Sequence, residues 1–483
     1  MKGRLESAVA IAKTEKRSPT ELPLPFDYDE QGSEENLTSW SGVPVLLQAF
    51  RSLGVPRSVK RNVAIKQRDR GLDEASYVES FVVLNAVGGE CLDDFEGLKQ
   101  DAALQELIGH AIPSPEAARK FLYQFHDETT ASPADLQLPL GASFVPEENE
   151  RLRGLGRVNA ETIQELGRRC PDQKIATIDL DATVIESWKR EAQPTYQGVS
   201  GYQPMLALWA EMNVIVADEF RDGNVAAHTG LLRVAQQAYA ALPESVSERM
   251  FRGDAACYEQ SLLKWLRNPQ REHGPEGMIQ FAVSARMSES LRERILQQPH
   301  SCWKAYRQDS EVECECVDVF GWDPMEERGL DPVRYVGIRI KRRQGELFGD
   351  GSEYKYFAVV TNMWKCDARR LLEWHREKAG SIEAAHDVLK NELAGGVLPC
   401  GRFGASAAWF RMAVLTYNVI TALKRLALPP ELLTARPKRL RFLIFNTAGR
   451  VIHHARALLC RCVARVGVWR QWRDMKALLP LPA

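Results

Sequence analysis

The stretch Lys174–Glu186 constrains the fold more than any other, because an apolar run there ends in acidic residues. In an extended strand, successive side chains point to opposite faces, so Asp179 and Asp181 share one face, and Ile178 and Leu180 share the other. Two carboxylates side by side at the end of a buried strand are unfavourable unless a positive group neutralises them. Mg²⁺ prefers oxygen ligands of this kind. The stretch therefore predicts a strand that carries a magnesium-dependent phosphoryl-transfer site.

Length and composition indicate a multidomain globular protein. The 483 residues predict about two to four domains, and the contents of 45% hydrophobic and 26% charged residues are ordinary for a soluble chain. The sequence has neither a long apolar run nor a secretory signal, so we expect a cytoplasmic protein. Its ten cysteines are too sparse for a disulfide scaffold, and we expect reduced thiols. A zinc site at Cys460 and Cys462 with His453 and His454 is the less favoured alternative.

The charges are unevenly distributed, although the net charge is only −1. Residues 18–50 contain acids but no Lys or Arg, whereas residues 421–483 are rich in Lys and Arg and contain only Glu431 and Asp474 as acids. A basic end is compatible with binding to a polyanion. A solvated, helix-rich tail explains the composition equally well.

The front of the chain reads as a flexible lead-in, residues 1–42, followed by a helical part, residues 43–170. Residues 57–70 read as a basic connector within it. Ser114 and Pro115 favour a helix start, so a helix-turn-helix reader of DNA is one interpretation, and an ordinary helical domain is the other.

Strands dominate after residue 170, with predicted strands over residues 201–210 and 214–220 that begin a mixed α/β domain. Alternating residues between 300 and 360 predict a β-rich insertion. Helices return afterwards. The predicted ones span 367–378, 381–393 and 405–426, and an Arg-interrupted apolar helix near 451–469 offers a dimer face.

The acidic stretch fits two families. It resembles the first motif of haloacid-dehalogenase-type phosphatases, with Asp179 as nucleophile and Asp181 as general acid, and Asp254 with Glu259 imitates the last motif of that family. Those enzymes also need a Lys between the two motifs. No Lys lies between Lys189 and Lys264, and Arg is a poor substitute for a point charge.

The chain resembles more closely the DDE transposases of bacterial insertion sequences, over roughly residues 45–428. The segments that carry the resemblance are LNAVGGECLDDFEGLKQDAAL, IPSPEAARKFL, IDLDATVIE, GYQPMLALWAE, FRDGNV, FRGDAACY, SIEAAHDVLKNEL and CGRFGASAAWFRMAVLTYNVI. Similarity to this group implies a ribonuclease-H-like mixed-sheet α/β core in residues 171–299 and 361–428. It also implies a helical DNA-binding domain in front, the β-rich insertion at 300–360 and a basic region at 429–483.

The resemblance implies that Asp181, Asp254 and Glu383 are the three catalytic, metal-binding acids, with Asp179 in support. Lys390 keeps the Glu-x6-Lys spacing of the third motif. The residues before Glu383 depart from the motif, because an aromatic residue and an Arg are expected where Arg376 and Ala379 stand. The nearest candidates, His375 and Lys378, are one residue out of register, and Glu377 is a weaker rival for the third acid.

By resemblance, the protein holds Mg²⁺, with Mn²⁺ as a substitute, and acts on its element's terminal repeats and on target DNA as a homodimer assembled on DNA, at the bacterial nucleoid. A catalytically decayed DNA-binding protein is the remaining alternative. Tryptophans are candidates for stacking a displaced base, although core packing is their commoner role. The candidate DNA contacts are Lys390, Arg376, Lys378, His375, Arg119, Lys120, Arg252 and Trp303.

Overall fold

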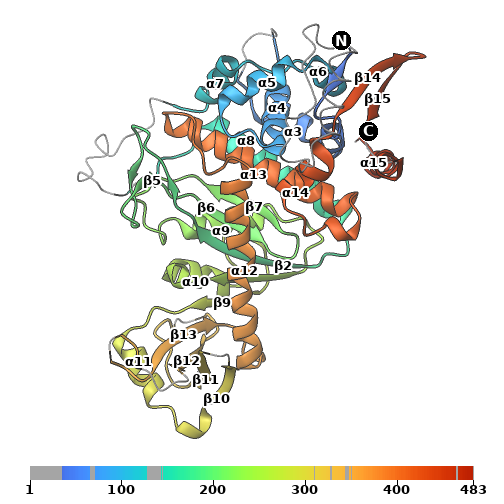
Figure 1. Ribbon diagram of the computed structural model, residues 1–483. Helices are drawn as coiled ribbons and strands as arrows, with labels where there is room; N and C mark the ends of the chain where they lie inside the picture. The colour runs from blue at the N-terminus through green and yellow to red at the C-terminus, as the bar shows by residue number, and fades with distance from the viewer. Residues whose placement is uncertain are drawn as a thin grey trace, which may run out of the picture.

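A nine-stranded mixed sheet forms the centre of the protein (Figure 1). The computed structural model describes residues 35–65, 71–127, 143, 145–308, 311–326, 329–342, 347–349, 351–463 and 466–481. The predicted lead-in therefore lies outside the described residues up to residue 34. The strand order is β10-β11-β12-β13-β9-β8-β2-β6-β7.

Five strands make up one half of this sheet: β2 (Ile175–Ala182), β6 (Met205–Trp209), β7 (Val214–Glu219), β8 (Glu248–Gly253) and β9 (Ile279–Ser284). The pairs β7–β6 and β6–β2 are antiparallel, whereas the pairs β2–β8 and β8–β9 are parallel. β6 and β7 are buried along their whole length, which explains why their sequences are almost continuously apolar. The strand predicted over residues 201–210 is interrupted at Pro204. Its first part, β5 (Ser200–Tyr202), joins a small separate sheet with β3 (Ile185–Glu186) and β4 (Gln193–Pro194).

The strands predicted in the insertion are confirmed, and they continue the same sheet. They are β10 (Lys304–Gln308), β11 (Val312–Val319), β12 (Arg334–Arg342) and β13 (Lys355–Thr361). All four are antiparallel, and β13 pairs with β9. Apolar and polar residues alternate most clearly along β11, whose sequence is VECECVDV.

Helices from both ends of the chain cover the half of the sheet that contains β6 and β7 (Figure 1). The front part contains α2 (Val43–Ser52), α3 (Val55–Asn62), α4 (Glu74–Val87), α5 (Phe95–Gln100), α6 (Ala102–Ile108), α7 (Pro115–Tyr123) and α8 (Glu150–Arg169). The apolar helix α13 (Phe403–Leu426) packs against α2, α4, α7, α8 and β7. Ser114 caps α7 as predicted, but the expected connector at 57–70 is wrong in its first residues, because they belong to α3.

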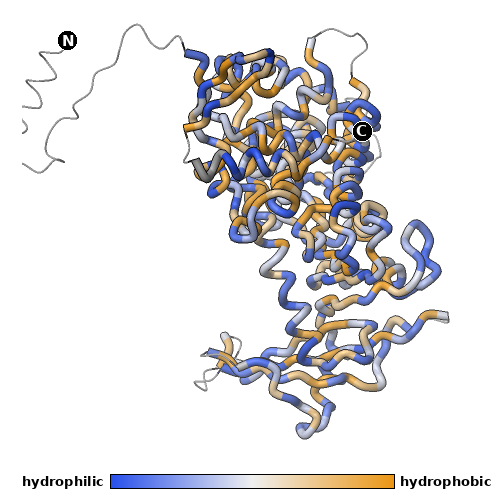
Figure 2. Tube along the Cα trace, turned by 90° about the vertical axis from the view of Figure 1, so that its right-hand side faces the viewer, coloured by the Kyte–Doolittle hydropathy of each residue, from blue (hydrophilic) through white to orange (hydrophobic). Residues whose placement is uncertain are grey.

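Three shorter helices, α9 (Leu231–Ala240), α10 (Gln260–Arg267) and α11 (Glu289–Leu296), connect strands of the sheet. The next helix, α12 (Ala368–Glu392), corrects the prediction of two helices separated near residue 380. It runs without a break from the insertion strands to the rest of the molecule (Figure 1, Figure 2). Gly380 permits this because one Gly weakens a helix without ending it.

The prediction of a helix near 451–469 is wrong. This region forms the hairpin β14 (Gly449–His454) and β15 (Ala457–Cys462), which is joined by Ala455 and Arg456 with positive φ angles of 49° and 64°. Such two-residue turns usually carry Asn-Gly, so the sequence gives little sign of this one. β1 (Leu37–Thr38) pairs with β14, while α14 (Pro437–Leu440) and α15 (Val466–Leu478) flank the hairpin. Among the described helices, none combines the length and apolarity needed to cross a membrane.

Candidate active site

Asp181 and Asp254 leave neighbouring strands side by side. β2 and β8 are parallel, and Leu180 lies opposite Gly253, so the next residue of each strand is an acid. Asp254 caps the short 3₁₀ turn Ala255–Cys257 through Oδ1, which accepts a hydrogen bond from the Ala256 amide at 2.9 Å. The parallel pairing thus brings together two carboxylates that are far apart in the sequence.

Helix α12 packs across β2 and β8 and brings charged side chains to these acids. The Nζ atom of Lys378 lies 3.7 Å from Oδ2 of Asp181, and the Lys378 side chain is only 11% exposed. Glu383 lies five residues further along the helix and is exposed. Two carboxylates from strand ends and one from a helix therefore face a common region, next to one buried ammonium group.

The electrostatics of Asp181 show that the other two acids lie close enough to affect it. Burial raises the pKa of Asp181, Lys378 opposes this rise, and the charges of Asp254 and Glu383 add to it. A raised pKa means that the charged carboxylate is disfavoured where it lies. A bound cation would reverse this effect.

Carboxylate oxygens are the donors that Mg²⁺ and Mn²⁺ take, so Asp181, Asp254 and Glu383 fit such an ion in their chemistry. As the described side chains are arranged, no three acidic, His or Cys groups lie close enough to hold one metal ion. Asp181, Asp254 and Glu383 are therefore the candidate ligands of such an ion.

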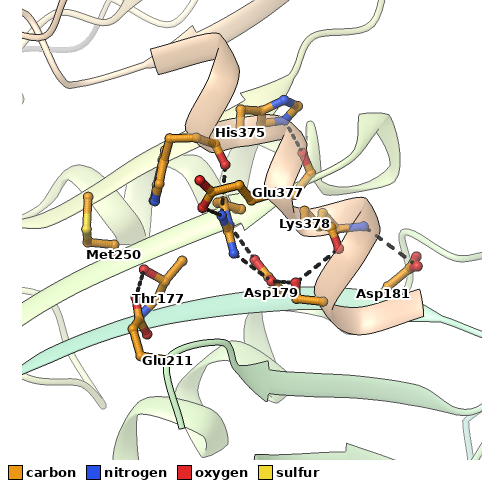
Figure 3. A network of polar contacts seen from close by, with 12 residues as sticks. Thr177, Asp179, Asp181, Glu211, Met250, His375, Glu377 and Lys378 are labelled. Atoms are coloured by element: carbon orange, nitrogen blue, oxygen red, sulfur yellow. Dashed lines mark hydrogen bonds and ion pairs between the residues drawn. The ribbon is translucent and has the colours of Figure 1, made fainter. Parts of the chain in front are cut away.

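Asp179 lies outside this set, which corrects its expected role in support of the metal. Its side chain is fully buried, and both oxygens accept hydrogen bonds from Arg252, at 2.7 Å from Nε and 2.9 Å from Nη2 (Figure 3). Ser381 on α12 donates a further hydrogen bond to Oδ2. A carboxylate satisfied in this way is a structural ion pair.

Arg252 is likewise unsuited to the DNA contact expected of it. Its side chain is 3% exposed, and its Nη1 atom donates to the Trp374 carbonyl at 2.8 Å and to Glu377 at 3.0 Å. Arg252 therefore ties β8 to β2 and both strands to α12 (Figure 3). Glu377, the alternative candidate for the third acid, is the α12 residue whose carboxylate pairs with Arg252.

Comparison with known proteins identifies the family. The sequence model described as transposase DDE domain group 1 matches residues 28–475. The chain belongs to this family of DDE-type transposases. The solved structures include a similar chain in the cryo-EM structure of the piggyBac transposase synaptic complex with hairpin DNA. That chain is 12% identical, with 81% of this chain and 77% of that chain covered and a TM-score of 0.40. No curated protein matches the sequence.

The family assignment removes the phosphatase alternative, which also needs Asp179 as an accessible nucleophile. In this DDE transposase, Asp179 is buried beneath α12 and held by Arg252 and Ser381.

Three further predicted residues of the transposase lie on helix α12. His375 contacts the Gly253 carbonyl through Nε2 at 3.0 Å, directly before Asp254, and burial lowers its pKa. The Nζ atom of Lys390 reaches the Val184 carbonyl at 3.4 Å. His375 therefore lies next to Asp254, and Lys390 contacts the chain that follows Asp181. Arg376 instead lines a cavity of about 580 Å³ with Tyr306, Arg307, Arg369 and Glu373.

Three other predicted residues lie away from α12 and already have partners. Arg119 and Lys120 are exposed on α7, and both pair with Glu116, at 3.1 Å and 3.4 Å. Trp303 is half-buried, with the guanidinium of Arg339 4.2 Å from its ring centre, so this ring is already stacked. Trp188, at 84% exposed, presents a freer ring.

The sequence did not indicate Ser381. Its hydroxyl joins Asp179 of β2 to the Lys378 carbonyl of α12, at 3.1 Å from the latter. The only feature of the sequence that points to Ser381 is its position one helical turn after Glu377. This spacing places both residues near the Asp179–Arg252 pair.

Proposed function

We propose that this DDE transposase cuts DNA at the ends of a bacterial insertion element and joins those ends to target DNA, with Asp181, Asp254 and Glu383 as its catalytic acids. The observation that carries the proposal is the convergence of these acids at the ends of β2 and β8 and on α12, within a chain of the transposase family.

We further assign a ribonuclease-H-like core to the five strands ordered β7-β6-β2-β8-β9. Support comes from the arrangement of three antiparallel strands followed by two parallel ones, with α12 packed on the strands that carry the acids. The first two acids then follow neighbouring parallel strands, a position where polar groups of α/β folds commonly gather.

The three acids are the proposed ligands of Mg²⁺, with Mn²⁺ as a substitute. When bound, a pair of such ions would activate a water molecule or a 3′-hydroxyl group for in-line attack and stabilise the leaving oxygen. The chain's own contribution is to fix the acids. β2 and β8 set the spacing of Asp181 and Asp254, and the Arg252–Asp179–Ser381 contacts hold α12, and with it Glu383, against those strands. No covalent enzyme intermediate is required.

DNA is the proposed partner, bound by a homodimer that brings two element ends together at the nucleoid. Basic side chains flank Glu383 along α12, with Lys390 seven residues after it and Arg376 seven residues before it. At 1.5 Å per residue, each lies about 10 Å from Glu383 along the helix axis, which corresponds to about three nucleotides of one DNA strand. The cavity at Arg376 offers several cationic groups to a phosphate of the same strand.

An assay of nicking and joining on the element's terminal DNA with Mg²⁺ tests the proposal. We expect Asp254→Asn and Glu383→Gln to abolish both reactions and to leave DNA binding intact. Glu289→Gln, an exposed acid on α11, serves as the matched control and keeps activity. Full activity of Glu383→Gln together with an inactive Glu377→Gln would transfer the third role to Glu377. Hydrolysis of a small phosphomonoester without any DNA cutting would overturn the proposal.

A further inference from the structure

We propose that Lys378 is a built-in counterion of the acid cluster, which competes with the divalent ion for Asp181 and so weakens metal binding. The inference rests on the proposed function, since it takes Asp181 as a metal ligand. It concerns a residue that the expected motif does not supply, because Ala379 stands where an Arg was expected.

The first support is the position of the ammonium group. Lys378 reaches from α12 toward the end of β2, and its Nζ lies 3.7 Å from Oδ2 of Asp181 (Figure 3). Its side chain is 11% exposed and that of Asp181 is 23% exposed, so water screens the pair poorly. A Lys is rarely buried this far without a charged partner.

The second support is the balance of charge around the pair. The charges of Asp254 and Glu383 act on the same Asp181 carboxylate that Lys378 faces, so the ammonium lies beside the most crowded of the three acids. The neighbouring cation Arg252 is committed to Asp179 and Glu377. Two further neighbours of Lys378 add no charge, because burial keeps the Cys257 thiol protonated and keeps His386 neutral, with a pKa of about 3. Lys378 thus reduces the repulsion among the acids when no metal ion is bound.

The same position creates a competition. A divalent ion bound to Asp181 takes the oxygen that Lys378 faces and is repelled by the ammonium at short range. Removing the Lys378 charge should therefore tighten metal binding and destabilise the metal-free protein. A Lys that serves only to grip a DNA phosphate predicts neither effect.

Mn²⁺ binding followed by electron paramagnetic resonance in the absence of DNA tests the inference on the full chain. Lys378→Gln removes the charge and keeps a polar end, and we expect its Mn²⁺ affinity to rise about tenfold. In EDTA its melting temperature should fall below that of the wild type, and saturating Mn²⁺ should raise it by more than in the wild type. Lys365→Gln, an exposed lysine just before α12, is the matched control and should change neither quantity.

A double-mutant cycle separates a local charge effect from general damage to the fold. With Asp181→Asn in both arms, the stability cost of Lys378→Gln in EDTA should largely disappear.

Unchanged or weaker Mn²⁺ binding by Lys378→Gln would overturn the inference, and weaker DNA binding in EDTA would then assign Lys378 to a phosphate. If the wild type binds Mn²⁺ and Asp181→Asn does not, the proposed metal site stands whatever Lys378 does. If the wild type binds no Mn²⁺ at these acids, the proposed function itself fails.

Discussion

At the scale of single residues, the site combines two carboxylates with opposite roles two positions apart on one strand. Asp181 faces Lys378 and the other acids at the strand end, whereas Asp179 is sealed below α12 in a bidentate pair with Arg252. The alternation of the strand puts both on one face, and only the register between β2 and β8 decides which of them meets a cation from the neighbouring strand.

Breaking the Asp179–Arg252 pair should destabilise the protein strongly. Arg252→Met leaves a buried carboxylate without its partner, and we expect a loss of about 3–5 kcal/mol in the free energy of unfolding. Adding Asp179→Asn should recover part of this loss, because the uncompensated charge is removed. Urea denaturation measures both. Arg369→Met, which breaks an exposed pair with Glu373, should cost less than about 1 kcal/mol. Equal costs for the two Arg variants would show that Asp179 is not buried as described.

At the scale of elements, sequence patterns located most strands and helices, because each carries its own periodicity and caps. Asp73 caps α4 and Gly88 ends it with a positive φ of 102°, and both residue types are common at these positions. The sequence patterns gave wrong predictions where contacts between distant parts of the chain determine the local structure. The turn at Ala455 and Arg456 is held by the pairing of β14 with β15 and β1, and Gly380 does not end α12 because neighbours hold the helix on both sides of it.

The continuity of α12 can be tested at Gly380. A Cβ atom added there meets no atom within 4 Å, so Gly380→Ala should stabilise the protein by about 0.5–1 kcal/mol through higher helix propensity. Thermal unfolding followed by circular dichroism measures the change. Gly154→Ala on α8 is the contrasting case, because its Cβ would lie 2.1 Å from the Asn62 carbonyl oxygen, and it should lower the melting temperature. A destabilising Gly380→Ala would indicate that α12 bends at this residue.

At the scale of the whole molecule, the insertion is part of the central sheet. Neighbouring residues of β13 enter different apolar clusters: Val360 belongs to the large core, and Val359 packs in a smaller cluster with Leu371 and Leu372 of α12. Sequence alternation predicted these strands. It contained no sign of the β13–β9 pairing that joins them to the strands β7-β6-β2-β8-β9, because that pairing depends on backbone hydrogen bonds between distant segments.

Leu371→Ala tests whether β10–β13 and the rest of the central sheet are stabilised together. The side chain is fully buried, so its truncation should cost about 2–5 kcal/mol. Because β13 pairs with β9, and β9 with β8, the loss should spread across the sheet. Native-state hydrogen exchange should then show faster exchange of amides in β13, β9 and β8 together. Faster exchange confined to β10–β13 would show instead that the insertion opens independently.

The pairing of β1 with β14 has a consequence for the order in which the protein is made. Residues 37 and 38 pair with 449 and 450, and the Ser41 amide donates to the Thr447 carbonyl at 2.8 Å. During synthesis this small sheet cannot close until nearly the whole chain has left the ribosome. Helix α12, which carries Lys378 and Glu383, also emerges long after β2 and β8. Asp181 and Asp254 are therefore synthesised long before the helix that packs beside them. A nascent chain, or a product truncated before α12, lacks the assembled site.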